Sequence, residues 1–355
     1  MDREKLIAGI KTNCDISDAQ FWGSYSICGL LMRLRELFRS EHSLAPWEAI
    51  PQGEIAEWIG RREKQWEALA EETLKQVEID GTLYDPFDVD GANAALAPYG
   101  LYYGAGYGIF NKPAFFLALL KGVEELYDYR IHHTGKEFCR DISAPLAMLQ
   151  GRCVVLRHEQ VSVLLWEKFL ELKGKRFGGL LDAAFASYGI TKESPFSQEL
   201  DAKMRTVSED IAGLFLFHEI GEAYEDDHSE KWLSILGNAG DKWTELYLRG
   251  IKDLLADTSD MGSLKSIVDM RRKPLLSFYM ALLSGTRREL FPEMIEAFRA
   301  FSDCGDWSLI EEARTRGYGK AHTMRASILS LDENNAPAIR RYLEAARENG
   351  WQPSL

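Results

Sequence analysis

Apolar residues recur at helical spacing along much of the chain. One stripe near the beginning has its members at i, i+4, i+7 and i+11, and it consists of Ile27, Leu31, Leu34 and Phe38. This spacing places the side chains on one face of a helix. Ser17 and Gln20 precede the stripe in an S-x-x-Q capping box, which predicts a helix start there. Pro46 and Pro51 then interrupt the pattern, and a second amphipathic helix follows.

The pattern changes over residues 80–160, which are predicted to hold the β element of the protein. Residues 81–113 are rich in glycine, tyrosine and aspartate, and Pro113 suits the first turn of a short apolar helix over residues 114–120. Strands are predicted over residues 127–133, 137–142 and 153–157, with a turn at Thr134 and Gly135 between the first two.

The second half of the sequence predicts helices alone. A polar stretch at residues 191–197 contains Pro195 and is the best candidate for a domain boundary. Beyond it, helices are predicted over residues 198–225, 229–257, 262–284, 286–302, 306–330 and 335–349. The expected fold class is therefore α+β and predominantly helical, with a helical N-terminal arm and a small β element in the first half. Two domains are predicted, an α+β domain over residues 1–190 and an all-α helical domain over residues 191–355.

Composition and charge narrow the range of partners. The chain has a net charge of −13 and its basic clusters are short, so a nucleic-acid partner is not expected. No basic segment leads into an apolar stretch at the start, and no apolar run approaches the ~20 residues that cross a bilayer, so we expect neither a secretory signal nor a membrane partner. Five widely spaced cysteines without a C-x-x-C pair are typical of a reducing compartment. These observations predict a soluble cytoplasmic protein.

Three segments carry a resemblance to a known family. They are IKTNCDISDAQFWGSYSICGLLMRLREL near the start, YDPFD followed by LYYGAGYG in the middle, and FHEIGEA in the helical part. Through them the chain resembles, over nearly its whole length, a bacterial protein family of unknown function. The resemblance implies a two-part organisation and a bacterial origin, and it implies no catalytic residue.

The helix predicted from residue 198 carries the strongest candidate site. Its apolar stripe, formed by Val207, Ile211 and Leu214, continues into the ionisable side chains of His218 and Glu222. Residues four apart on a helix face the same point in space. A buried carboxylate without a partner costs several kcal/mol, so Glu222 is expected to have a partner or a proton.

Three interpretations of this pair compete. In the first, the pair is structural, and His218 bonds Glu222 or another helix. In the second, His218 and Glu222 bind zinc, iron or manganese, because H-E-x-x-E differs from the zincin H-E-x-x-H only at its last position. Asp253 and Asp257, again four residues apart, could complete this metal site from a neighbouring helix. In the third, His218 forms a metal-free acid/base site with Glu219 or Glu222.

Glu225 and His228 follow with the E-x-x-H spacing of helical di-iron bundles. The run EDDHSE that contains them is more typical of a solvated helix end, and the chain holds no second E-x-x-H.

Two further patterns could bind ions, although each has a simpler explanation. The glycines of GAGYG, with Lys112 and a helix start after them, could cradle an anion, or they could form a glycine-rich strand and turn packed by tyrosines. Asp85, Asp88 and Asp90 resemble a calcium loop, but its glycine and closing glutamate are misplaced, so turn residues explain them better.

Histidine and cysteine side chains in the first half give weaker signals. His132 and His133 are neighbours in a predicted strand and point to opposite faces, so at most one of them can meet His158. Cys14 precedes the predicted capped helix, but no nearby histidine can serve as its base. Structural roles are expected for all of these residues.

Two classes of function remain open from the sequence. In the first, the helical domain holds a buried His/carboxylate site with a divalent transition metal that performs hydrolytic or redox chemistry. In the second, the protein is a non-catalytic interaction or scaffold module that binds another protein or a second copy of itself.

Overall fold

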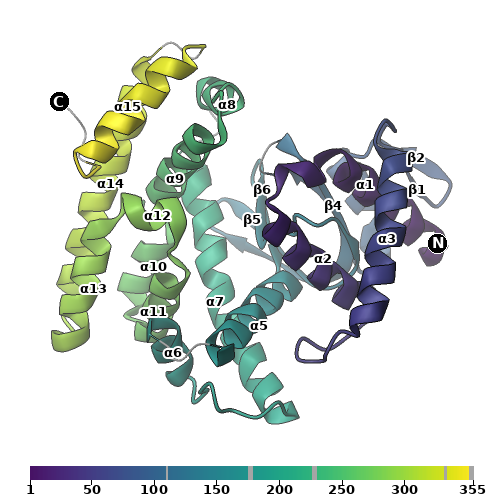
Figure 1. Cartoon of the computed structure of the whole chain (residues 1–355), viewed down its shortest axis with the longest axis horizontal. Coiled ribbons are helices and arrows are strands. Elements are labelled where there is room, and N and C mark those ends of the chain that lie inside the picture. The colour runs from purple at the N-terminus through teal and green to yellow at the C-terminus, as the bar shows by residue number, and fades with distance from the viewer. Residues whose placement is uncertain (109–110, 175–178, 226–229, 332–333, 352–355) are drawn as a thin grey trace. The chain divides into compact units, whose positions relative to one another are not determined.

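The chain folds into two compact units (Figure 1), and the computed structural model describes residues 1–108, 111–174, 179–225, 230–331 and 334–351. Unit 1 consists of Met1–Glu171 and Phe196–Ser208, and unit 2 of Leu172–Pro195 and Glu209–Leu355. Unit 1 contains strands and helices, whereas the described part of unit 2 is helical. The α+β, predominantly helical class predicted from the sequence is therefore confirmed. The division into domains at residue 190 stays a prediction.

A five-stranded sheet forms the centre of unit 1. Its strands are β3 (Leu101–Tyr107), β4 (Pro113–Leu126), β5 (Tyr129–Arg140), β6 (Ala147–Gln150) and β7 (Cys153–Arg157), in the order β3-β4-β5-β7-β6. Neighbouring strands are antiparallel except β5 and β7, which are parallel. A separate pair, β1 (Val77–Ile79) and β2 (Thr82–Tyr84), forms a small hairpin.

The predicted helix over residues 114–120 is wrong, because these residues belong to β4. Phe115 and Leu117 pack in one core cluster, and Phe116 and Ala118 pack in another. The strand is thus buried on both faces at this end. Such a strand has a continuous apolar run that periodicity alone does not distinguish from a buried helix.

The two strands predicted over residues 127–133 and 137–142 are one continuous strand, β5. Thr134 and Gly135 lie within this strand, and the chain instead turns before it, where Tyr127 adopts a positive φ of 53°. The strand predicted over residues 153–157 is confirmed as β7.

Unit 1 contains the helices α1 (Arg3–Phe21), α2 (Ile27–Glu41), α3 (Gln52–Leu69), α4 (Val89–Leu96) and α5 (His158–Gly174), with short 3-10 turns η1 (Trp22–Ser24) and η2 (Ala97–Tyr99). Of these helices, α1 packs against β4 and β5, and α4 packs against β3. The predicted helix start at Ser17 is wrong, because α1 begins after its N-cap Asp2 and continues to Phe21. The stripe of Ile27 to Phe38 does lie on one helix, α2, whose N-cap is Ser26.

Lys112 is buried in unit 1 and does not form the anion cradle considered from the sequence. Its Nζ lies 2.9 Å from Asp18 Oδ1 and 3.0 Å from Asp141 Oδ1, and all three side chains are 1% exposed. Burial raises the pKa of Asp18 to about 7 despite the charge of Lys112. Burial acts in the same direction on Asp141, but Lys112 and Ser143 hold its pKa at about 2. The cluster therefore fastens α1 to the sheet and offers no free cation.

Unit 2 begins with α6 (Gly179–Ala186) and the second part of α7 (Gln198–Tyr224). It continues with α8 (Glu230–Gly237), α9 (Lys242–Thr258), α10 (Ser263–Met270), α11 (Lys273–Leu282), α12 (Gly285–Leu290), α13 (Pro292–Cys304), α14 (Trp307–Ser330) and α15 (Ala336–Glu348). Three of the predicted long helices are each divided in two. The break between α10 and α11, for example, falls at Arg271, which adopts the left-handed conformation.

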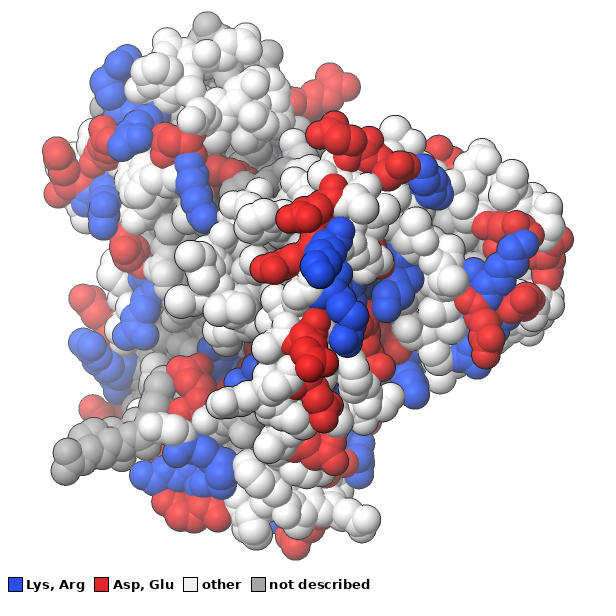
Figure 2. Space-filling view, turned by 45° about the vertical axis from the view of Figure 1, so that its right-hand side comes forward, with Lys and Arg blue, Asp and Glu red and all other residues white. Residues whose placement is uncertain are grey.

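No described helix combines the length and the apolar character needed to cross a membrane. On the face shown in Figure 2, acidic and basic side chains are interspersed among uncharged ones, and its described residues show no continuous basic surface. That nucleic acid is not a partner stays a prediction.

Candidate metal centre

Helices α7 and α9 approach each other closely because small residues meet at their contact. A Cβ atom added at Gly221 of α7 would overlap the backbone oxygen of Ala256 on α9, and one added at Gly262 would overlap the same oxygen. Ser263 further links the segments by donating a hydrogen bond to the Leu214 carbonyl at 2.7 Å. Gly221, the glycine in FHEIGEA, is therefore required for α7 and α9 to approach each other where they carry the candidate residues.

His218 bridges the two helices. Its Nδ1 donates to Asp257 Oδ1 on α9 at 2.8 Å, since an ionised carboxylate can only accept. Its Nε2 lies 3.3 Å from Glu222 Oε1, one turn further along α7. The i, i+4 pair predicted from the sequence is thus confirmed as a contact, and one of the two aspartates predicted on a neighbouring helix binds the other ring nitrogen.

Asp253 completes a three-residue group with His218 and Glu222. Each offers one potential ligand atom, and these three atoms lie within 4.8 Å of one another. Ligands at about 2.0–2.2 Å from a transition metal are separated by roughly 3–4 Å, so a small contraction would allow all three to bind one ion. The side chains of His218 and Glu222 keep 18% and 11% of their surface exposed, so solvent reaches them.

Positive side chains offset the acids of this cluster. Lys252 of α9 donates to Glu222 Oε2 at 2.5 Å, which leaves Glu222 Oε1 directed at His218. Arg287 of α12 lies 3.8 Å from Asp257 Oδ2, and Tyr279 of α11 donates to the same oxygen at 3.0 Å. Both oxygens of Asp257 are therefore occupied by protein groups.

The pKa values follow from this pairing. Burial lowers the pKa of His218, but Asp257 and then Glu222 outweigh it and hold that pKa well above its usual range. For Glu222, burial is outweighed by His218 and Lys252, so its pKa is lowered. The pKa of Asp257 is lowered as well, because Arg287 and His218 outweigh its burial. The two carboxylates thus favour the protonated form of His218, and a metal ion bound at Nε2 would compete with that proton.

Asp253 and Glu219 are the acids of the cluster that lack close partners. Neither makes a hydrogen bond or an ion pair with the described residues. Burial raises the pKa of Asp253, and burial together with the charge of Glu222 raises the pKa of Glu219 to about 7. Both carboxyl groups thus lie near the cluster without an ion-pair partner among the described residues. This is expected of groups that act on a ligand.

Three residues of the cluster were not predicted from the sequence: Lys252, Tyr279 and Arg287. Lys252 directly precedes Asp253, and this adjacency was the one local signal for it. Tyr279 and Arg287 come from helices whose proximity no sequence pattern indicates.

The contacts of Glu225 do not support the second ligand pair, Glu225 and His228, that the E-x-x-H spacing suggested. Its carboxylate accepts from Tyr318 of α14 at 3.3 Å, and its carbonyl accepts from Arg325 at 2.9 Å. His228 lies outside the described residues.

The weaker candidates of unit 1 make contacts within their own unit. His133, and not His132, meets His158, with 2.9 Å between Nδ1 and Nε2, which confirms that one of the two neighbours joins it. Asp85 and Asp88 accept from the backbone N–H groups of Phe87 and Gly91, as turn and cap residues do. Cys14 is fully buried against Phe115.

The fold and the cluster define a two-unit α+β protein with a His/carboxylate centre in its helical unit. The chain belongs to a family of unknown function, DUF6866: residues 5–157 match the N-terminal domain of this family, and residues 162–350 match its C-terminal domain. The resemblance to a family of unknown function is therefore confirmed. No curated protein and no solved structure matches the chain.

Proposed function

We propose that unit 2 binds one divalent transition metal ion, zinc, iron or manganese, and uses it for hydrolysis. His218 Nε2, Glu222 and Asp253 are the ligands. The observation that carries this proposal is the convergence of three potential ligand atoms from two helices within 4.8 Å.

Asp257, which the sequence suggested as a fourth ligand, has a different role in this proposal. Its two oxygens are bonded to His218 and Tyr279, so it orients the imidazole and keeps Nε2 free for the ion. A carboxylate on the far nitrogen is the usual partner of a metal-bound histidine, and it also raises the basicity of that ligand.

Glu219 is proposed as the general base. It follows His218 directly, and the charges of Glu222, His218, Lys252 and Asp253 all act on its carboxyl group. The metal would supply a Lewis acid that polarises the substrate and its attacking water. Glu219 takes a proton from that water as the new bond to oxygen forms, and it passes the proton to the leaving group as the old bond breaks. A side chain suited to proton transfer favours hydrolysis over redox chemistry.

A protein-interaction role is the second candidate, and a separate observation favours it. Helix α2 exposes an apolar row, with Ile27, Leu31 and Met32 exposed by 79%, 49% and 58%. Contiguous apolar side chains of this kind are typical of surfaces that another protein covers. The row lies in unit 1, so the two roles do not exclude each other. A bacterial origin and a cytoplasmic location remain part of the proposal.

The Asp257→Asn variant tests the assignment of the metal site. The change keeps the shape of the side chain but removes the charge that orients His218, so we expect zinc affinity to fall about 10–100-fold. Zinc binding is measured by competition with a chromophoric chelator. Asp260→Asn, at an exposed aspartate beyond the end of α9, is the matched control and should bind zinc as the wild type does. Equal affinity in wild type and Asp257→Asn would contradict the role of Asp257.

A further inference from the structure

Unit 1 contains a pocket between α2 and α5 that is unrelated to the metal centre. Its volume is about 340 Å³, and a second cavity of about 170 Å³ adjoins it. The two cavities share five lining residues: Glu36, Arg140, Gln160, Val163 and Glu167. They therefore form one continuous groove. The part that the two cavities share is lined mainly by charged and polar side chains.

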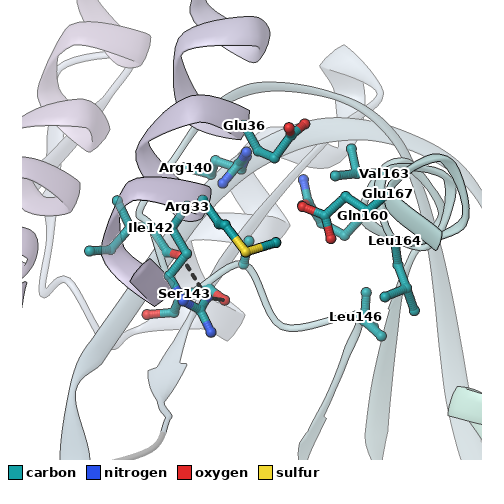
Figure 3. Close-up of a pocket in the computed structure, with 13 residues that line it drawn as sticks. Arg33, Glu36, Arg140, Ile142, Ser143, Leu146, Gln160, Val163, Leu164 and Glu167 are labelled. Carbon is teal, nitrogen blue, oxygen red and sulfur yellow. Dashed lines mark hydrogen bonds between the residues drawn. The ribbon is translucent and has the colours of Figure 1, made fainter. Parts of the chain in front are cut away.

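Two glutamates that accept no hydrogen bond from the described residues face this groove. Figure 3 shows Glu36 extending from α2 and Glu167 extending from α5 towards the same opening. Glu167 makes no hydrogen bond or ion pair with the described residues. The nearest cationic atoms to Glu36 are Arg39 Nε at 3.6 Å and Arg35 Nε at 3.8 Å, which exceed hydrogen-bond length.

Gln160 adds a third acceptor to the groove. Its residue is 4% exposed, and its Nε2 donates to Glu137 Oε2 at 2.7 Å. Because that carboxylate can only accept, the amide nitrogen must face Glu137 and the amide oxygen must point the other way. This Oε1 has no partner among the residues that the structure describes. Gln160 lines both cavities, so a buried side chain presents an unsatisfied acceptor to them.

The arginines of the groove are partly bonded to the protein, and the buried Nε atoms of Arg39 and Arg140 have no hydrogen-bond partner among the described residues. Arg33 Nη1 donates to the carbonyls of Ile142 and Ser143 at 2.9 and 2.8 Å. Arg140 Nη1 donates to the Asp141 carbonyl at 3.2 Å, and its buried Nε lies 3.8 Å from Glu137. Within the part of the chain that the structure describes, unpaired donors thus remain at these two Nε atoms, and acceptors without a hydrogen bond remain at Glu36, Glu167 and Gln160.

The two carboxylates repel each other, although the charge of Arg140 acts favourably on both, and the pKa values agree with this arrangement. Burial raises the pKa of Glu36. Burial and then the charge of Glu36 raise the pKa of Glu167. A cation placed between the two would relieve both effects.

Apolar side chains form the remaining wall of the larger cavity. They are Met32, Ile142, Ala144, Leu146, Val163 and Leu164. A ligand that fits this groove has a cationic head with several N–H donors and an apolar tail.

We propose that the groove between α2 and α5 binds a small primary amine with an unbranched apolar chain. Its ammonium group lies among Glu36, Glu167 and Gln160, which match the three N–H donors of an ammonium. Its hydrocarbon tail packs against Met32, Val163 and Leu164. The site is distinct from the metal centre in unit 2, so each can be tested without the other.

The probe for this site is n-pentylamine, titrated into the full-length protein by calorimetry at neutral pH. Its uncharged analogue n-pentanol and its anionic analogue pentanoate are titrated in parallel. We expect pentylamine to bind at least about tenfold more tightly than either, because a charge-assisted hydrogen bond is worth ~1.5–3 kcal/mol.

Two variants and a control complete the test. Glu167→Gln should weaken pentylamine binding about tenfold, whereas Glu171→Gln, at an exposed glutamate one turn further along α5, should not change it. Met32→Trp reshapes the apolar end at a side chain that is 58% exposed, so the fold should tolerate it, and it too should weaken binding. Equal binding of the three probes, or unchanged binding by Glu167→Gln with an unchanged melting temperature, would overturn the proposal.

Discussion

Glu219→Gln is expected to keep zinc bound and to lose hydrolytic activity by about 100-fold or more. Glutamine has the size of glutamate but cannot accept the proton of the attacking water. Glu219 is not among the three residues whose ligand atoms converge, so the substitution should leave the metal ligands in place. The zinc-loaded proteins would be assayed with p-nitrophenyl acetate, a generic ester, and their metal content measured in the same samples.

Glu209→Gln is the matched control for this prediction. Glu209 lies on the same helix, α7, and is exposed to solvent. Its substitution should change neither zinc content nor activity. If Glu219→Gln hydrolyses the ester as fast as the wild type does, Glu219 is not the base, although the metal site itself would stand.

Lys112→Met is expected to lower the free energy of unfolding by about 3–5 kcal/mol at pH 8. The substitution leaves Asp18 and Asp141, both nearly inaccessible, without the cation that bonds them at 2.9 and 3.0 Å. Removing one partner of a buried ion cluster costs far more than removing an exposed one. Lys168→Met, which breaks the exposed pair of Lys168 with Glu171, should cost less than about 1 kcal/mol.

The effect of Lys112→Met should depend on pH. In the wild type the pKa of Asp141 is held at about 2, so its contribution to stability is complete above its unfolded pKa of about 3.9 and is lost as the pH falls towards 2. Without Lys112, the pKa values of both aspartates rise in the folded state. At pH values between the unfolded pKa and the raised folded pKa, the folded variant binds more protons than the unfolded chain does. Its free energy of unfolding therefore falls as the pH rises. Urea unfolding should therefore show a smaller loss at pH 5 than at pH 8, and a pH-independent loss would contradict this account.

The local part of the His/carboxylate cluster was predictable from the sequence, because helix geometry alone places His218 and Glu222 together. The i, i+4 rule needs no knowledge of neighbouring elements. The same rule paired Asp253 with Asp257 on a second helix. It could not show which helix lies beside which, and that proximity depends on the close approach of Gly221 to Ala256.

The errors in the secondary structure predicted for the first half of the chain have a common physical cause. β4 is buried on both faces at its beginning, so its apolar residues lack the alternation that marks a strand. Ser17 has the sequence of a helix cap, but it serves instead to bond the Pro113 carbonyl and Lys112 in the interior. In both cases tertiary burial outweighs the local pattern. The groove of α2 and α5 was not predictable, since Glu36 and Glu167 are 131 positions apart in the sequence and look like ordinary helix-surface residues.

Elemental analysis of the purified, untagged protein beside the His218→Ala/Glu222→Ala variant tests the central claim most directly. Both proteins would be prepared without chelators, and the fold of the variant checked by circular dichroism. We predict close to one zinc, iron or manganese ion per wild-type chain and none in the folded variant. Absence of metal from both proteins, with a large loss of stability in the variant, would contradict the claim and make the cluster a structural ion network.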